Sequence, residues 1–133
     1  MKNIAIREHH LYNKVFQRGK RCVGEYVAVY VLRDLSAGRL RKAHPEKKYV
    51  NRLGLSVSKK LGGAVERNRA KRVIRAAYDV HKERLKTGNL IVISPRIAIL
   101  TVKSQAVAAE LEGLFAKLGL LRPEQSEEKS KIQ

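Results

Sequence analysis

The middle of the chain restricts the possible folds more than any other part. Leu53-Gly54-Leu55-Ser56-Val57-Ser58 alternates aliphatic with small residues, which is typical of a strand with one buried face. Gly62-Gly63 then precede a long helical segment that we place at residues 64–86, before Gly88. Residues 90–93 form an uninterrupted apolar run, as in a strand covered on both faces. A strand, a helix and a strand in this order form a crossover unit, so we expect the two strands to pair in parallel.

The remaining elements complete one small domain. A short helix is predicted before Gly19 from apolar residues at helical spacing: Leu11, Tyr12, Val15 and Phe16. Residues 26–32 and 49–58 favour strands, and the mixed segment 34–48 between them favours a loop. A final amphipathic helix from about Lys103 is marked by Val107, Leu111, Leu114, Phe115 and Leu118. The order α-β-β-α-β-α predicts an α+β sandwich, with one mixed sheet packed by helices, over residues 1–121. Residues 122–133 have no apolar face to bury, and we expect a disordered tail there.

The charge of the chain predicts a polyanionic partner. The 133 residues include 29 Lys and Arg against 12 Asp and Glu, for a net charge of +17, while 44% are hydrophobic, enough for a packed core. Residues 1–90 carry 23 basic and 7 acidic groups (+16), whereas residues 91–133 carry 6 and 5 (+1). The binding surface is therefore expected in the first two-thirds of the chain.

Several classes of protein are disfavoured by the same sequence. The single cysteine, Cys22, excludes an internal disulfide and a cysteine-based zinc site. Arg7 and Glu8 interrupt the N-terminus where a signal peptide would need apolar residues, and residues 90–102 are too short and too interrupted to span a bilayer. We therefore expect a soluble, cytoplasmic protein with no membrane partner.

The long helix carries the densest group of basic residues. Between residues 52 and 75 there are eight basic residues and one acid, Glu66. Such a run often forms a solvated helix face, but solvated helices usually mix charges of both signs, so polyanion binding is favoured here. Arginine suits phosphate because its planar fork can bond two oxygens, and Asn68 can both donate and accept. The predicted polyanion-binding residues are Lys59, Lys60, Arg67, Asn68, Arg69, Lys71, Arg72 and Arg75, and composition alone does not say which polyanion they bind.

Three aromatic residues indicate a second contact surface. Tyr12 and Phe16 lie one helical turn apart, and Tyr30 lies on the first predicted strand. Exposed together on a sheet face, they would form a platform for unstacked bases of single-stranded RNA. The alternative is that they belong to the core.

No arrangement typical of protein-based catalysis is found. The two aspartates and four histidines show no metal-ligand spacing, and there is no P-loop or nucleophile elbow. We therefore assign no catalytic and no metal-binding residues to this chain.

The sequence resembles the bacterial ribonuclease P protein component. The resemblance is carried by Arg67-Asn-Arg-Ala-Lys-Arg-Val-Ile-Arg75 preceded by Gly-Leu-Ser-Val-Ser-Lys-Lys, together with Lys14-Val-Phe-Gln-Arg-Gly19 and the strands at 26–32 and 90–93. It implies a ribosomal-protein-like fold with a left-handed βαβ crossover, against the usual hand. It also implies a small accessory subunit bound to a large catalytic RNA, which removes the 5′ leader of precursor tRNA with Mg²⁺ held mainly by RNA.

The resemblance assigns roles to both surfaces. The basic residues of the long helix would contact the catalytic RNA, and Tyr12, Phe16 and Tyr30 would line a cleft for the leader. Two alternatives remain at this stage. A structural rRNA-binding protein of ribosomal type would explain the charge and size equally well, and a DNA-binding helical module would explain the charge but not the predicted strands.

Overall fold

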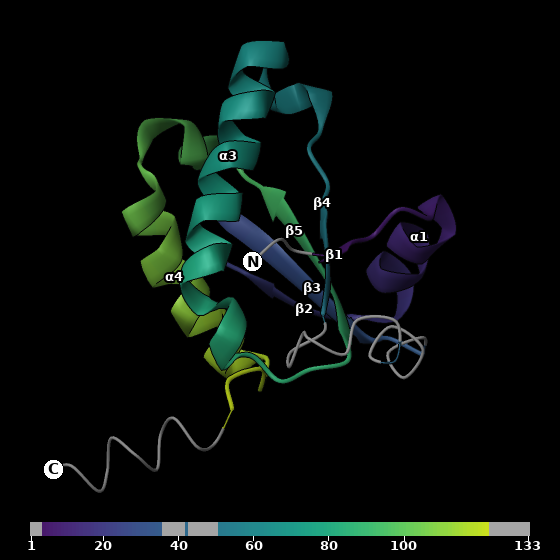
Figure 1. The fold of residues 1–133 in the computed structure, drawn as a ribbon. Coiled ribbons are helices and arrows are strands. Elements are labelled where there is room, and N and C mark those ends of the chain that lie inside the picture. Colours follow the sequence, from purple (N-terminus) through teal and green to yellow (C-terminus); the bar gives the residue numbers. More distant parts are fainter. Residues whose placement is uncertain (1–3, 36–41, 43–50, 123–133) are drawn as a thin grey trace, which may run out of the picture.

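The computed structural model describes residues 4–35, 42 and 51–122, which form one mixed sheet with helices on both faces (Figure 1). The strands lie in the order β1-β4-β5-β3-β2. Their bounds are β1 Ile4–Ala5, β2 Lys20–Val23, β3 Val27–Arg33, β4 Arg52–Leu55 and β5 Asn89–Pro95. The α-helices are α1 His9–Arg18, α3 Ala64–His81 and α4 Ser104–Lys117, and three short 3-10 helices are η1 Lys59–Leu61, η2 Lys82–Arg84 and η3 Ile97–Thr101.

Strand β5 lies in the centre of the sheet and pairs differently on its two sides. It runs parallel to β4, with Leu53 opposite Ile91, and α3 connects the two strands. The predicted parallel pairing across a helical crossover is therefore confirmed. On its other side β5 runs antiparallel to β3 along seven residue pairs, from Val27–Pro95 to Arg33–Asn89. The sheet is mixed, as the sequence predicted.

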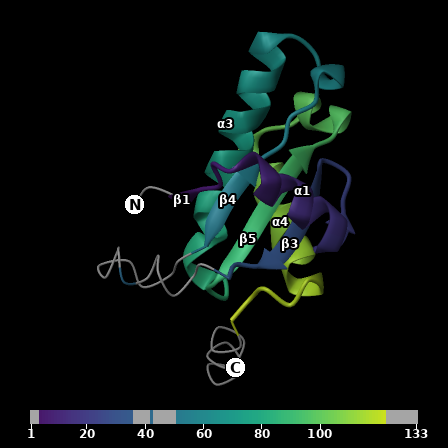
Figure 2. The same cartoon turned by 90° about the vertical axis from the view of Figure 1, so that its right-hand side faces the viewer.

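The helices divide the core into two parts. Helices α3 and α4 cover one face of the sheet, and α1 covers the other (Figures 1 and 2). Alternate side chains of β5 point to opposite faces of the sheet. Ile91 and Ile93 pack under α3 and α4, whereas Leu90 and Val92 pack under α1. All four are at most 2% exposed, which explains the continuous apolar run in this strand.

The predicted element order omitted two strands. The order in the structure is β1, α1, β2, β3, β4, α3, β5, α4, so β1 and β2 are additions at the two edges of the sheet. Strand β1 has two residues, and β2 begins with exposed Lys20 and Arg21, so neither carries a hydrophobic pattern. Pairing with β4 and β3 stabilises them, and charged residues on an edge strand are common because they oppose edge-to-edge aggregation.

The long helix is shorter than predicted. Helix α3 ends at His81 rather than near residue 86, and η2 follows. Leu85 is fully buried in an extended conformation and forms a β-bridge with Leu121. Burying Leu85 at this bridge requires the chain to leave the helix, which helix periodicity alone does not indicate.

Two predicted irregular segments lie mostly outside the described residues. Most of the predicted loop 34–48 and residues 49–50 of the next predicted strand lie outside the described residues, whereas Asp34 is buried. Of the predicted tail, residues 123–133 lie outside them. Arg122, assigned to that tail, instead donates from its backbone N–H to the carbonyl of Arg84 and from its guanidinium to that of Glu83. Among the described residues, no helix combines the length and hydrophobicity needed to cross a bilayer.

Candidate nucleic-acid interface

Helix α3 places an apolar stripe on the core and leaves its basic residues outside. Ala70, Ile74 and Ala77 are fully buried, and Val73 is half-buried against the same core. These four residues are the apolar arc that a 3.6-residue period predicts. The basic residues of the helix therefore occupy its two flanks and its outer face.

A sharp turn brings two lysines to the start of α3. Lys59 and Lys60 are exposed in η1, where the Ser58 hydroxyl accepts a hydrogen bond from the backbone N–H of Lys60. Gly62 then has a φ of 146°, a conformation that favours glycine, and a Cβ there would lie 3.0 Å from Cβ of Glu66. This glycine sets the approach of η1 to the helix, so both lysines lie next to the first turn of α3.

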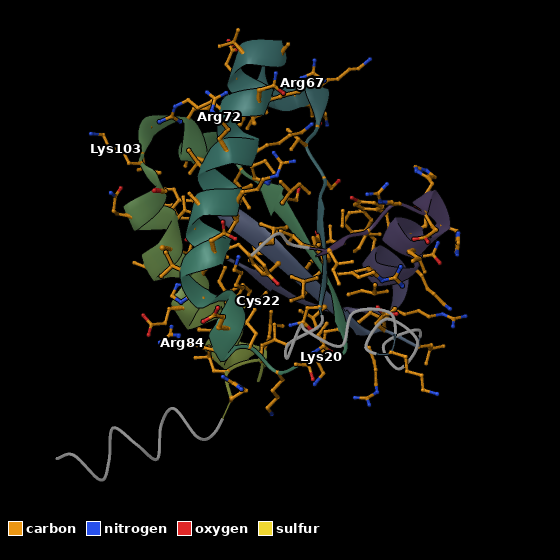
Figure 3. All side chains as sticks on the ribbon, viewed as in Figure 1. Lys20, Cys22, Arg67, Arg72, Arg84 and Lys103 are labelled. Carbon is orange, nitrogen blue, oxygen red and sulfur yellow. The ribbon has the colours of Figure 1, made fainter. Side chains whose placement is uncertain are left out.

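The basic residues of α3 point in different directions. Arg67, Lys71 and Arg75 follow one flank at four-residue spacing, while Asn68 and Arg72 are exposed on the outer side (Figure 3 labels Arg67 and Arg72). Within the described part of the chain, no carboxylate lies at ion-pair distance from any of six basic side chains: Lys59, Lys60, Arg67, Lys71, Arg72 and Arg75. The result is a strongly positive helix surface, defined by these six residues and called the basic surface below.

Arg69 has a structural partner that the sequence did not indicate. Its guanidinium donates to the carbonyl of Val102 at 2.9 Å and to that of Ile99 at 3.5 Å, so it ties η3 to α3. Arg69 is half-buried on the flank opposite Arg67. The motif arginines thus differ in their surroundings: Arg67 and Arg69 are both half-buried, whereas Arg72 and Arg75 are exposed.

The three predicted aromatic residues lie on the other face of the sheet, beside α1. The rings of Phe16 and Tyr30 meet edge to face, with centroids 4.8 Å apart and an interplanar angle of 87°. Phe16 is 40% exposed, which favours a contact role over a core role for this residue. Tyr12 and Tyr30 are half-buried against the small core under α1. The structure therefore brings Phe16 and Tyr30 together and places Tyr12 on the same side.

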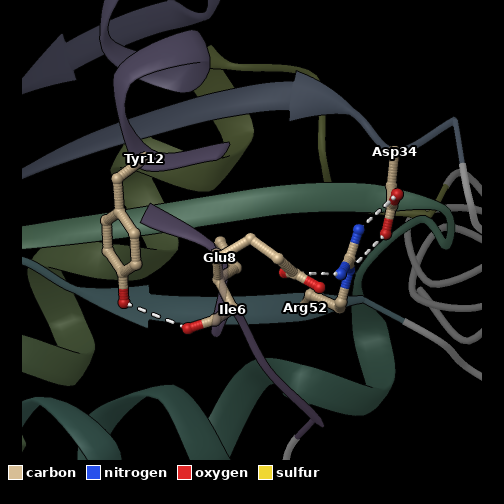
Figure 4. Close-up of polar contacts among 5 residues, drawn as sticks. All are labelled: Ile6, Glu8, Tyr12, Asp34 and Arg52. Atoms are coloured by element: carbon tan, nitrogen blue, oxygen red, sulfur yellow. Dashed lines mark hydrogen bonds and ion pairs between the residues drawn. The ribbon is translucent and has the colours of Figure 1, made fainter. Parts of the chain in front are cut away.

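The position of Tyr12 depends on a glycine in the adjacent strand. A Cβ at Gly54 of β4 would lie 2.7 Å from the Cε1 and hydroxyl oxygen of Tyr12, so the ring lies directly on the backbone there. The hydroxyl donates to the carbonyl of Ile6 at 3.4 Å (Figure 4). Burial raises the pKa of Tyr12, and a backbone hydrogen bond from Leu55 partly opposes that rise. We call Tyr12, Phe16 and Tyr30 the aromatic face below.

A buried ion-pair network that the sequence analysis missed fixes α1 on the sheet. Arg52 of β4 donates from Nε and one terminal nitrogen to the two carboxylate oxygens of Asp34, at 2.8 and 2.9 Å (Figure 4). Its other terminal nitrogen donates to Glu8, just before α1, at 3.3 Å. The hydrogen bond to Asp34 raises the pKa of Arg52, against the effect of burial. The partners lie 18 and 44 residues away, so no local pattern could have indicated them.

The described residues do not gather a metal-binding group. Nowhere in that part of the chain do three or more His, Cys, Asp or Glu side chains lie close enough to hold a metal ion.

The fold and the two surfaces define a small, basic α+β protein of the class that associates with nucleic acid. A comparison with protein-family models matches residues 1–119 to the ribonuclease P model. The chain belongs to the ribonuclease P protein component family. The family name implies a nuclease ribonucleoprotein of tRNA processing, in which the protein is a partner of an RNA subunit.

Similar proteins and structures span nearly the whole chain. The ribonuclease P protein component of Clostridium acetobutylicum is 31% identical and covers 91% of this chain and 93% of its own length. That of Bacillus velezensis is 33% identical over 94% of this chain and 97% of its own. Among solved structures, the RNase P protein of Staphylococcus aureus has a TM-score of 0.70 at 26% identity, covering 91% of this chain and 100% of that one. The RNase P protein of Thermotoga maritima has a TM-score of 0.63, also at 26% identity, covering 86% and 94%.

Proposed function

We propose that this protein binds the catalytic RNA of ribonuclease P through the basic surface and holds the 5′ leader of precursor tRNA on the aromatic face. It thereby promotes endonucleolytic removal of the leader in the cytoplasm. The observation that carries the proposal is the set of six basic side chains around α3 without a carboxylate partner among the described residues.

The charge of the basic surface is the physical reason for RNA binding. Like charges at four-residue spacing, such as Arg67, Lys71 and Arg75, repel each other in a helix. An RNA backbone offsets that repulsion, because the protein cations pair with its phosphates and release the counterions condensed on the RNA. Exposed Asn68 between these residues adds a side chain that can both donate to phosphate and accept from a ribose hydroxyl.

The aromatic face supports a role in leader binding. An exposed ring such as Phe16, held edge to face by Tyr30, offers a surface on which an unpaired base can stack. Helix α1, which carries Tyr12 and Phe16, and helix α3, which carries most of the basic surface, lie on opposite faces of the sheet (Figure 2). An assembly that contacts both surfaces must therefore extend around an edge of the sheet, which suits two RNA segments better than one short strand.

In this proposal the RNA subunit carries the chemistry. Mg²⁺ is held mainly by the RNA subunit and the substrate, and the cations of the protein lower the repulsion between phosphates that approach each other. The protein supplies binding and positioning rather than a general base.

The basic surface can be tested by precursor tRNA cleavage at low Mg²⁺ with the catalytic RNA. The wild-type protein should stimulate cleavage, and the Arg67→Gln/Arg75→Gln variant should lose much of this effect. Lys117→Gln, at the exposed end of α4, is the matched control. Arg69 is not replaced, because its hydrogen bonds also hold η3 against α3. A variant at Arg69 could lose stability as well as RNA binding, and the two effects could not be separated. Absence of stimulation by folded wild-type protein would instead favour an rRNA-binding role.

The salt dependence of RNA binding adds a quantitative test. Six neutralised phosphates predict a slope of log affinity against log salt of roughly −4 to −5. The Arg67→Gln/Arg75→Gln variant should reduce the magnitude of the slope by roughly 1.5. A wild-type slope near −1 would mean that the basic surface does not bind the RNA.

The aromatic face requires a different comparison. Phe16→Leu should weaken binding of precursor tRNA by about 1–3 kcal/mol, the range for one stacked base. It should leave the affinity for mature tRNA unchanged, because mature tRNA has no leader. Equal losses for both RNAs would show that Phe16 does not contact the leader.

A further inference from the structure

A separate cavity lies on the other flank of α1 from the aromatic face. Its volume is about 470 Å³. Leu11, Lys14 and Arg18 line it at three- and four-residue spacing, whereas Tyr12 and Phe16 do not line it. Buried Val15 lies between these two stripes of the helix. The rest of the lining comes from Glu8 and the start of α1, the end of β3 and the two residues after it, and the starts of β4 and β5.

The charges around this cavity favour an anionic ligand. Both carboxylates that line the cavity, those of Glu8 and Asp34, form ion pairs with Arg52. Lys14, Arg18 and Arg33 have no carboxylate at ion-pair distance within residues 4–35, 42 and 51–122. Three cations without a carboxylate partner in this part of the chain thus line one concave site, and such a site attracts a phosphate group.

The walls of the cavity favour a ligand that also has an apolar surface. Leucine side chains at positions 11, 32, 35 and 90 line it, and they come from α1, β3, the residues after β3 and β5. Its volume lies within the range of about 300–1,000 Å³ that is typical of small-molecule sites. Inorganic phosphate would use the cations but leave the leucine walls uncovered.

We propose that this cavity binds one nucleotide, with its phosphate between Lys14, Arg18 and Arg33 and its base against the leucine walls. The site is distinct from the basic surface on α3 and from the aromatic face. The ligand chemistry is a nucleoside 5′-phosphate, supplied either as an unpaired residue of an RNA strand or as a free nucleotide.

Calorimetric titration of the isolated full-length protein tests the site with three probes: AMP, adenosine and inorganic phosphate. AMP should bind at least tenfold more tightly than inorganic phosphate, and adenosine should bind at least tenfold more weakly than AMP. Absence of AMP binding at millimolar concentration would overturn the proposal, as would equal affinity for AMP and phosphate.

Matched variants locate the binding. Lys14→Gln/Arg18→Gln should weaken AMP binding at least tenfold, and Leu35→Ser should weaken AMP binding but not phosphate binding. Leu35 is 87% exposed, so its replacement leaves the core unchanged. Arg67→Gln/Arg75→Gln and Lys117→Gln should leave AMP binding unchanged. Circular dichroism checks that each variant is folded, and unaltered AMP binding by folded Lys14→Gln/Arg18→Gln would refute the site.

Competition distinguishes the two sources of the ligand. If an RNA residue occupies the cavity, saturating AMP should lower the affinity of the wild-type protein for precursor tRNA or the catalytic RNA. If a free nucleotide is the ligand, AMP should bind without lowering either affinity. Both outcomes support the nucleotide site and remain separate from the function of the basic surface, which the Arg67→Gln/Arg75→Gln variant tests.

Discussion

Glu110 of α4 holds the turn between β2 and β3, and its replacement should cost a large part of the stability of the protein. Its carboxylate accepts hydrogen bonds from the backbone N–H groups of Glu25, Tyr26 and Val27, the last two at 2.9 and 3.0 Å. A side chain on Gly24 would overlap this carboxylate, so the turn is built closely around it.

The expected loss can be worked out from these contacts. A hydrogen bond to a charged group contributes about 1.5–3 kcal/mol to the free energy of unfolding. The Glu25 N–H is exposed and water can replace its partner, whereas those of Tyr26 and Val27 are partly buried. With a discount for partial solvation, Glu110→Gln should lower the free energy of unfolding by about 2–4 kcal/mol. For a chain of this length, this corresponds to a decrease in Tm of roughly 7–14 °C.

Thermal and urea unfolding followed by circular dichroism would measure this loss. Glu112→Gln is the matched control, because Glu112 lies on the same helix and is exposed, with a 3.5 Å ion pair to Arg84. Such a surface pair contributes about 0–1 kcal/mol to the free energy of unfolding. The reasoning would be refuted if Glu110→Gln and Glu112→Gln had the same effect, or if amide exchange at Tyr26 and Val27 were no faster in Glu110→Gln.

Three further substitutions test the packing around the sheet. Arg52→Met should lower the free energy of unfolding in urea by about 3 kcal/mol, because Asp34 stays buried without its guanidinium partner; a change below about 1 kcal/mol would contradict this. Gly54→Ala should cost about 1–3 kcal/mol, since the new methyl group displaces the Tyr12 ring, and an unchanged Tm would show that the ring moves freely. Gly113→Ala, where a Cβ meets nothing within 4 Å, should instead stabilise α4 by about 0.5–1 kcal/mol, measured in the same urea titration.

The central crossover could be predicted because its signals are local. The alternation at Leu53-Gly54-Leu55 matches β4, with both leucines packed under α3 and the glycine against Tyr12 on the other face. The apolar run 90–93 matches β5, which is buried on both sides. Alternating and continuous apolar patterns extend over only a few residues, so these strands can be recognised in the sequence without the tertiary structure.

The candidate site could be predicted in its residue types but only partly in its geometry. The density of basic residues identified α3, and none of the predicted cations has a carboxylate partner in the part of the chain described. Arg69 instead donates to the carbonyl groups of Ile99 in η3 and Val102 just after it, 30 and 33 residues further along the chain. The cavity beside α1 was not predicted, because it forms where α1, β3, β4 and β5 meet.

The sequence by itself determined the α+β class, the basic helix between two parallel strands and the family, since composition, periodicity and a contiguous motif are local properties. Only the tertiary structure decided the edge strands β1 and β2 and the ion pair between Arg52 and Asp34. It also decided the hydrogen bonds of Glu110 to the turn between β2 and β3, and the direction of each arginine. These features depend on partners up to 85 residues apart. A polar group acquires such a partner only when folding buries it and it must replace the hydrogen bonds that water supplied.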